Sequence, residues 1–351
     1  MAIYLQIIHN FSVINWSIFD FSLRTNMNIR SLFSTLLLVL ASSFAFANSV
    51  SCWKPLLSAN EINQILQAHS DAVTVIDIRP PNAPDPDSSY NAGHIPGALS
   101  SPYGNWRGPA ENPGKFLSQS QLTTLVQGLG LTADTPTVVL HKGDSYSDFG
   151  AAARVYWTLK TAGLQQLAVV DGGFTAWKQA GLPISKEVTK ASPSSYPATI
   201  QADWLASTND VEQQLNRSNT KLLDARPEAF FLGEKWHGAA AKPGTISGAD
   251  DFDNKQWFRS GGPLLEAPER LQTLVQQNGL DQAEVTVSFC NTGHWAATNW
   301  FVLSEVVGQE GVKLYPESMV EWSAAGLPMD NVPGRLKWAW LNTKQWFTNT
   351  F

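Results

Sequence analysis

Hydrophobic and polar positions divide this chain into two halves with the same pattern. Short runs rich in β-branched and other apolar residues, bounded by polar residues, Gly or Pro, predict buried strands. Each half has three such runs: 73–79, 137–140 and 167–170, then 221–226, 285–289 and 312–315. Longer stretches after the second run of each half, 149–161 and 296–307, predict helices. Because strands and helices alternate, the pattern favours an α/β fold, with parallel sheets covered by helices on both faces.

Sequence motifs recur in the same order in both halves. The shared motifs are an Asp-x-Arg-Pro strand end, a Gly-x-Ile-x-Gly-Ala turn and a closing Trp-containing segment that is predicted to be a short helix. They occur at 77–80, 93–98 and 177–183 in the first half, and at 224–227, 244–249 and 322–328 in the second. Such an internal repeat indicates two tandem domains.

The repeat sets the expected domain boundaries. We expect one α/β domain at 53–186 and another at 203–330. Between them, the segment 186–198 is rich in Ser, Pro and Thr, as is typical of a linker. The C-terminal tail, 331–351, is rich in Trp and is expected to pack back on a domain.

The first 47 residues have the features of a targeting segment. Arg30 precedes an apolar run at 32–47, which ends in Ala45-Phe-Ala47 and is typical of a secretory signal peptide cleaved before Asn48. The run is shorter than the ~20 residues of a membrane span, so we expect no stable membrane span after cleavage. Met27 is the expected true start within this N-terminal extension, and the mature protein is predicted to be exported to the periplasm.

Composition narrows the function classes. Of 351 residues, 43% are hydrophobic and 15% are charged, which leaves ample apolar material for packed cores. The net charge of −6 is spread without blocks of Lys or Arg, which argues against a nucleic-acid-binding surface. The six His have no spacing typical of a metal site.

The chain has two cysteines, Cys52 and Cys290. Export favours disulfides, so the two cysteines either form one bridge or are both free. The residues before Cys52 lack the Leu expected ahead of a lipid-anchored cysteine, and we favour an incidental or packed thiol there.

Cys290 lies at a junction that favours a reactive thiol. It follows the predicted strand at 285–289 and precedes the loop Asn291-Thr-Gly-His-Trp295, after which the predicted helix begins. The carboxyl end of a strand in an open α/β sheet faces the ligand crevice. Loop N–H groups and the helix dipole stabilise thiolate over thiol, and the thiolate is the nucleophile. Gly293 allows backbone angles that other residues avoid.

These motifs resemble those of the tandem rhodanese family over nearly the whole mature chain. Tyr90-x-x-x-His-Ile-Pro-Gly-Ala98 resembles the amino-terminal signature of that family. Val312-x-x-Tyr-Pro-x-Ser-x-x-Glu-Trp322 resembles its carboxyl-terminal signature, and Asp171-Gly-Gly-Phe174 is the matching segment of the first half. Two positions depart from the family pattern: Ala176 stands where Glu is frequent, and Glu317 where the family has Gly.

The resemblance implies two tandem rhodanese-like domains, each a parallel sheet flanked by helices, of which the first is inactive and the second catalytic. His141 takes the place of Cys290 in the first half, and the loop after it, 142–148, has no thiol. For His141 we favour a structural role over a vestigial site residue or an interface contact.

The implied activity is sulfur transfer. The Cys290 thiolate attacks the outer sulfur of a small anionic donor such as thiosulfate, releases sulfite and becomes a persulfide. A thiophilic acceptor, cyanide in the usual assay, then takes the sulfur. This chemistry requires no metal and no organic cofactor.

The resemblance also implies substrate-binding residues. Arg226 corresponds to a family position that contacts the substrate, although an Arg tied to Asp224 or to backbone carbonyls is an equal alternative. Asp224 itself is expected to hold a loop. The remaining predicted substrate-binding residues form the loop after the cysteine: Asn291, Thr292, Gly293, His294 and Trp295.

Within that loop, His294 is expected to be partly cationic near neutral pH, because the reference pKa of His is about 6.5. Trp295 is expected to narrow the mouth of the pocket. Lys235, His237 and Lys242, in the insertion after the first strand of the second half, either add positive charge to the site or lie on a solvated surface.

The identity of the donor depends on the loop after the cysteine. Family members that prefer thiosulfate often have basic residues there, whereas members that prefer 3-mercaptopyruvate have a smaller and more neutral loop. The loop 291–295 matches neither pattern. We favour thiosulfate because export suits an inorganic donor, with 3-mercaptopyruvate as the second choice.

Three other functions share some of these features. A cysteine phosphatase needs an Arg at the end of its loop, and here Trp295 is followed by Ala296-Ala297. A non-catalytic rhodanese scaffold that binds a protein partner explains the first domain but not the Cys290 loop. An exported persulfide relay to a protein sulfur acceptor uses the same Cys290 chemistry, and poor turnover of free thiosulfate would distinguish it.

Overall fold

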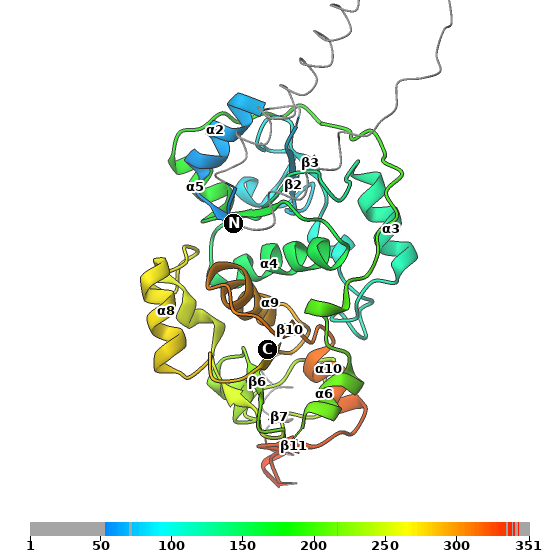
Figure 1. The fold of residues 1–351 in the computed structure, drawn as a ribbon, viewed down its shortest axis with the longest axis vertical. Helices are drawn as coiled ribbons and strands as arrows, with labels where there is room; N and C mark the ends of the chain where they lie inside the picture. Colours follow the sequence, from blue (N-terminus) through cyan, green and yellow to red (C-terminus); the bar gives the residue numbers. More distant parts are fainter. Residues whose placement is uncertain are drawn as a thin grey trace, which may run out of the picture. The chain divides into compact units, whose positions relative to one another are not determined.

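A computed structural model of the chain describes residues 53–69, 72–215, 217–334, 336–338, 340 and 343 (Figure 1). The predicted N-terminal extension and signal peptide at 1–47, Cys52 and Trp346 lie outside the described residues. Within these ranges, no helix has both the length and the apolar character needed to cross a membrane.

The first domain is built on a five-stranded parallel sheet in the order β1-β5-β4-β2-β3. Its strands are β1 (Leu56–Leu57), β2 (Thr74–Asp77), β3 (Leu99–Ser100), β4 (Thr137–Leu140) and β5 (Leu167–Val170). Its helices are α2 (Ala59–His69), α3 (Gln119–Gly128), α4 (Tyr146–Thr161) and α5 (Gly173–Gln179), with the 3-10 turns η1 (Pro86–Ser88) and η2 (Tyr103–Trp106).

The second domain is built on a four-stranded parallel sheet in the order β10-β9-β6-β8. Its strands are β6 (Thr220–Asp224), β8 (Asp250–Asp251), β9 (Val285–Phe289) and β10 (Val312–Leu314), and a separate antiparallel pair joins β7 (Thr245–Ile246) to β11 (Met329–Asp330). Its helices are α6 (Thr208–Gln214), α7 (Glu228–Phe231), α8 (Pro268–Gln277), α9 (Trp295–Trp300) and α10 (Ser318–Ala324). Shorter turns are η3 (Ala202–Trp204), η4 (Asn254–Trp257), η5 (Arg259–Gly261) and the π-helical turn η6 (Phe301–Val306), which continues α9.

Successive residues of each strand enter different cores. In β4, Val138 and Leu140 pack in the cluster that contains α2 and α5 residues, whereas Val139 packs in the cluster that contains α3 and α4 residues. Side chains of a strand alternate between the faces of a sheet, so both faces are covered. This confirms the α/β class that the hydrophobic pattern predicted.

The two domains share one of these cores. Val139 of the first sheet and Leu223 of the second belong to the same cluster of buried apolar residues, and α4 packs against α9 within it (Figure 1). Twelve of the 16 residues of α4 are buried, as expected for a helix that is covered nearly all round. The two domains are therefore fixed to each other by a common apolar interior.

The closing helix of each domain starts earlier than the sequence predicted. We expected helices at 177–183 and 322–328, whereas α5 begins at Gly173 and α10 at Ser318. Both residues have positive φ angles, 57° and 53°, so the chain turns sharply after the last strand and enters the helix at once. The hydrophobic pattern carries no information about this turn.

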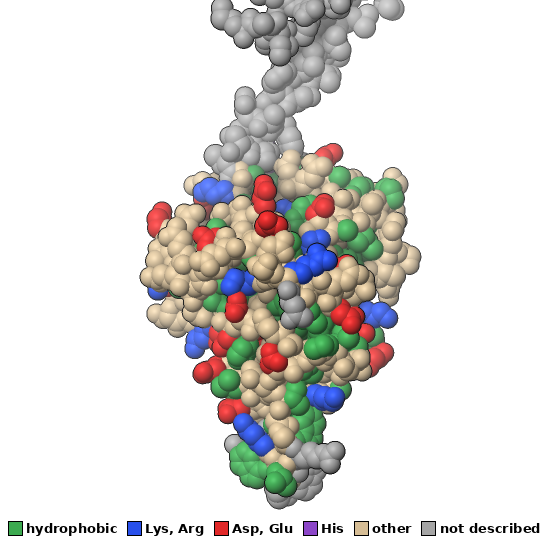
Figure 2. Space-filling view, turned by 60° about the horizontal axis from the view of Figure 1, so that its bottom comes forward, with side chains coloured by type: hydrophobic (Ala, Val, Ile, Leu, Met, Phe, Trp, Pro, Cys, Tyr) green, Lys and Arg blue, Asp and Glu red, His purple; other side chains and the backbone are tan. Residues whose placement is uncertain are grey.

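The segments outside the predicted domains also make contacts. The linker lies along the first domain, because Ser194 Oγ donates to Leu131 O (2.6 Å) and Tyr196 OH donates to Ala162 O (3.0 Å). In the tail, Trp338 stacks on Trp236 of the second domain, with ring centroids 5.7 Å apart. On the face displayed in Figure 2, acidic and basic side chains are interspersed and no basic patch is visible.

Candidate active site

Cys290 occupies the carboxyl end of a central strand. It follows β9 directly, and β9 lies between β10 and β6 in the sheet. The thiol is free and only 1% exposed. The loop 290–294 then leads into α9, so the strand–loop–helix junction expected from the sequence is present.

Ser318 holds this loop from within the second domain. Its Oγ accepts hydrogen bonds from the N–H groups of Cys290 (3.0 Å) and Gly293 (3.2 Å), and it donates to Tyr315 O (2.8 Å). The hydroxyl therefore fixes the two ends of the turn around the cysteine. Ser318 holds this position with the positive φ of 53° described above.

Gly293 is required by close packing as well as by its φ of 67°. A Cβ atom at this position would collide with the Arg154 guanidinium and with Pro316 O. The loop thus lies directly against a side chain of the first domain, an approach that only glycine permits.

Two arginines of the first domain bind the loop carbonyls. Arg107, which follows η2, donates from Nη2 to Thr292 O (2.9 Å). Arg154 of α4 donates from Nη1 to Gly293 O (3.3 Å) and, at longer range, to Thr292 O (3.5 Å). These contacts explain why Thr292 and Gly293 are buried although they belong to a loop.

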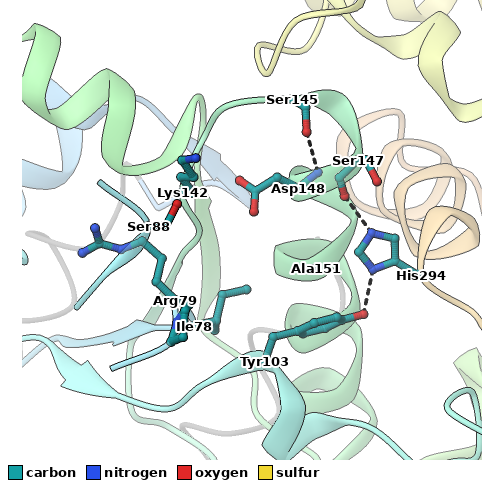
Figure 3. Close-up of a pocket in the computed structure, with 11 residues that line it drawn as sticks. Ile78, Arg79, Ser88, Tyr103, Lys142, Ser145, Ser147, Asp148, Ala151 and His294 are labelled. Atoms are coloured by element: carbon teal, nitrogen blue, oxygen red, sulfur yellow. Dashed lines mark hydrogen bonds between the residues drawn. The ribbon is translucent and has the colours of Figure 1, made fainter. Parts of the chain in front are cut away.

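His294 links the loop to the first domain. Its Nε2 contacts Ser147 O (2.7 Å) and its Nδ1 contacts Tyr103 OH (2.8 Å), as Figure 3 shows. Because a carbonyl oxygen only accepts, Nε2 carries the proton and Nδ1 accepts from the tyrosine. Burial, reinforced by the charge of Arg107, lowers the pKa of His294 to about 4. The ring is neutral at pH 7, so the expected partial positive charge is absent.

Trp295 also faces the first domain. Its Nε1 donates to Ser147 Oγ (2.8 Å), and its ring packs edge-on against Phe230 at 5.9 Å. The side chain is thereby anchored between the two domains. Whether it also narrows the entrance to Cys290, as the sequence predicted, stays a prediction.

Arg226 is buried and fully engaged. Its Nε and Nη2 donate to the Asp224 carboxylate (2.8 and 2.6 Å), Nη2 also donates to Gly244 O (2.7 Å), and Nη1 reaches Asn291 Oδ1 (3.3 Å). Arg79 makes the same kind of contacts with Asp77 in the first domain, which lacks the cysteine. These contacts agree with the second of the two alternatives for Arg226, an arginine tied to Asp224 and to a backbone carbonyl, and its remaining donor reaches Asn291.

The first domain has a pocket at the corresponding end of its own sheet. It has a volume of about 440 Å³, and its lining includes Lys142, Ser145, Ser147 and Tyr103 together with His294 of the second domain (Figure 3). His141, at the position equivalent to Cys290, contacts Asp148 Oδ2 (2.6 Å) and Val170 O (3.2 Å). Those contacts within its own domain agree with the structural role that we favoured.

Sequence analysis missed five residues whose side chains hydrogen-bond to the loop: Tyr103, Arg107, Ser147, Arg154 and Ser318. One signal was available, since Arg154 is the single charged residue of the apolar stretch 149–159. Of the basic residues in the second-domain insertion, Lys235 and Lys242 are exposed. His237 is half-buried, and burial together with Arg107 lowers its pKa.

Within the described ranges, no group of three or more His, Cys, Asp or Glu side chains is arranged to hold a metal ion. The groups gathered around the loop are a buried thiol, backbone N–H groups and two arginines. Fold and site together define a class: a two-domain α/β protein with a buried cysteine at a strand end of its second domain and His141 at the equivalent position of its first.

Comparison with known proteins identifies this class. The family model of the rhodanese-like domain matches residues 58–180 and 207–325. A candidate thiosulfate sulfurtransferase of Mycobacterium tuberculosis is 30% identical over 255 residues, which cover 69% of this chain and 88% of that protein. The sulfur carrier protein TtuD of Thermus thermophilus is 28% identical over 255 residues, which cover 68% of this chain and 86% of that protein. The chain belongs to the rhodanese-like sulfurtransferase family, with two rhodanese-like domains in tandem.

A solved structure shares the fold. The anaerobic ergothioneine biosynthesis enzyme of Chlorobium limicola, in complex with its natural substrate trimethyl histidine, has a TM-score of 0.69 at 19% identity. The match covers 80% of this chain and 71% of that one. At this level of identity the likeness concerns the fold alone.

Proposed function

We propose that this protein is a sulfurtransferase that moves the outer sulfur of thiosulfate to a thiophilic acceptor through a persulfide on Cys290. The observation that carries this proposal is the position of Cys290, a free thiol in a loop fixed from both sides, by Ser318 and by the first domain. The names of the relatives, a thiosulfate sulfurtransferase and a sulfur carrier, support the same chemistry.

The first half-reaction is a displacement at sulfur. The Cys290 thiolate forms a bond to the outer sulfur of thiosulfate, the S–S bond of thiosulfate breaks, and its electron pair leaves with sulfite. The total charge of −3 is unchanged, since a persulfide anion and sulfite replace a thiolate and thiosulfate. In the second half-reaction the acceptor attacks the outer persulfide sulfur, and the Cys290 thiolate leaves.

Burial of the thiol favours a small donor over a protein donor. Cys290 is 1% exposed, and the adjacent His294 and Trp295 are hydrogen-bonded to the first domain. A protein persulfide would reach the sulfur only after this part of the interface opened. The persulfide relay is therefore the second candidate, and the sulfur carrier among the relatives is what favours it.

Steady-state kinetics test the proposal. Initial rates measured over a grid of thiosulfate and cyanide concentrations should give the parallel reciprocal lines of a ping-pong mechanism. The Cys290→Ser variant, which keeps the size of the side chain, should have no activity. Intersecting lines, or activity in the variant, would contradict transfer through Cys290.

The same assay ranks the donors. We expect a higher kcat/KM with thiosulfate than with 3-mercaptopyruvate. A higher kcat/KM with 3-mercaptopyruvate would make this keto acid, and not thiosulfate, the proposed donor. Slow turnover with both, combined with rapid reaction with a protein persulfide, would favour the relay.

A further inference from the structure

Two positive charges meet at the Cys290 loop without a partner of opposite charge. Arg107 and Arg154 both donate to the carbonyl oxygen of Thr292. Neither guanidinium takes part in any ion pair of the described residues. Buried charges normally have such a partner, as Arg79 and Arg226 do.

Each of the two guanidiniums also has an unused donor. Arg107 Nη1 and Arg154 Nε are buried, and neither has a hydrogen-bond partner among the described residues. The whole Arg154 residue is only 1% exposed. An unsatisfied buried N–H on a charged group is costly, and an anionic ligand would satisfy it.

Arg154, the more deeply buried of the two arginines, lies within electrostatic reach of Cys290. The electrostatic interaction with Cys290 acts to raise the pKa of Arg154, and it is a smaller effect than burial. Burial and the neighbouring Arg107 act in the opposite sense and lower the pKa of Arg154 to about 10, so its guanidinium remains charged at pH 7. An anion beside Cys290 would relieve the repulsion between the two arginines.

Glu317 is an acidic group that interacts electrostatically with Arg154, but it forms no ion pair with either arginine among the described residues. Its Oε1 instead accepts from Phe116 N (3.2 Å), and burial raises the pKa of its carboxyl group. The loop itself contributes no fixed charge, because Asn291 and Thr292 are neutral and His294 is unprotonated at pH 7.

We propose that Arg107 and Arg154 bind the sulfonate end of a dianionic sulfane donor, so that the first domain supplies the donor site of the second. This inference rests on the proposed function. Bound in this way, the sulfonate oxygens accept from Arg107 Nη1 and Arg154 Nε, and the outer sulfur is presented to Cys290. The domain without a nucleophile thus selects the donor.

Two donors with the same reacting bond test the inference. Thiosulfate carries two negative charges, and methanethiosulfonate carries one. In Arg107→Gln and Arg154→Gln, we expect kcat/KM for thiosulfate to fall about tenfold or more, mainly through KM, because a charge-assisted hydrogen bond is lost. The fall for methanethiosulfonate should be clearly smaller.

Matched variants separate charge from structure. Arg107→Lys keeps the charge without the planar donor geometry and should lie between wild type and Arg107→Gln. Arg270→Gln, on the exposed face of α8, removes an equal charge far from the loop in sequence and should leave both donors unaffected. If Arg154→Gln fails to fold, Arg107→Gln carries the test, since Arg107 is only partly buried.

Binding without chemistry provides an independent readout. Calorimetric titration of Cys290→Ser with thiosulfate should show binding, and adding Arg107→Gln should weaken it about tenfold or more. Unchanged binding, or an equal loss of kcat for both donors at constant KM, would overturn the inference and leave the arginines a role in holding the loop. Failure of the proposed function would give a different result: the wild-type protein itself would then transfer sulfur from neither donor.

Discussion

At the scale of single residues, Ser318 is the side chain that defines the turn around the nucleophile. It is the acceptor for two loop N–H groups, those of Cys290 and Gly293. In Ser318→Ala these donors are left unsatisfied, so we expect the free energy of unfolding to fall by about 2 kcal/mol. Persulfide formation, followed in a single turnover with thiosulfate, should slow about tenfold, which corresponds to about 1.4 kcal/mol.

Ser318→Gly is the matched control. It also removes the hydroxyl, but it relieves the positive φ of 53°. We expect it to be more stable than Ser318→Ala and equally slow. Wild-type rates in both variants would show that the hydroxyl does not position the loop.

His294 gives the protein a defined pH dependence. Its pKa is about 4 in the folded state, against about 6.5 in the unfolded chain. Between these values the unfolded state binds more protons than the folded state, so the free energy of unfolding increases with pH. The stability that neutral His294 contributes is therefore lost as the pH falls from about 6.5 to about 4. The loss attributable to this group reaches about 3 kcal/mol.

Urea denaturation of wild type and His294→Gln at a series of pH values measures this contribution. Gln can still donate to Ser147 O and accept from Tyr103 OH. The difference in stability between the two proteins should change over that pH window and be flat above it. A constant difference would show that His294 titrates normally.

At the scale of secondary-structure elements, α4 and the Cys290 loop approach each other at Gly150. A Cβ atom there would lie 3.0 Å from His294 O and 3.2 Å from His294 Nε2. A Cβ atom added to Gly128, the last residue of α3, would lie in open space. Substitution of Gly128 by Ala therefore measures helix propensity alone, whereas substitution of Gly150 by Ala measures helix propensity together with packing between the domains.

Gly128→Ala should raise the free energy of unfolding by about 0.5–1 kcal/mol, because Ala favours the helix over Gly. Gly150→Ala should not show this gain, and its kcat/KM with thiosulfate should fall several-fold as the loop is displaced. Chemical denaturation and steady-state assays check both. Equal stabilisation of the two variants with full activity would contradict the close approach.

The central strands of each sheet were the elements most open to prediction from sequence, because runs rich in apolar and β-branched residues such as those of β4 and β9 mark buried parallel strands. The two-residue strands β1, β3, β7, β8 and β11 were missed, because so short a segment shows no pattern. The predicted second-domain helix, 296–307, agrees with the span of α9 and η6, but the π-helical form of η6 was not foreseen, in which Val307 N donates to Val302 O (2.9 Å). Such a turn depends on packing against the rest of the molecule.

At the scale of the whole molecule, the shared core should make the two domains unfold together. Phe301 lies in this core, with its ring 5.5 Å from Phe149 and 5.0 Å from Tyr156 of the first domain. Phe301→Ala should cost about 3–5 kcal/mol. Hydrogen exchange should then increase in β4 as well as in β9, whereas an increase confined to β9 would indicate independent domains.

The donor site shows where prediction from sequence stops. Cys290 could be identified because strand, loop and helix are consecutive along the chain. Arg107 and Arg154 are more than a hundred residues away, and their contact with Thr292 exists only because the two domains pack through α4 and α9. An Arg within an apolar helix signals a buried partner but does not say which one.

Sulfur transfer through Cys290 is tested most directly by intact-mass analysis. The purified protein and Cys290→Ser are each incubated with thiosulfate, separated from it and weighed by mass spectrometry. We predict a gain of one sulfur atom in the wild-type protein, reversed by cyanide, and no gain in the variant. An unchanged mass in the wild-type protein, or an equal gain in Cys290→Ser, would contradict a persulfide on Cys290.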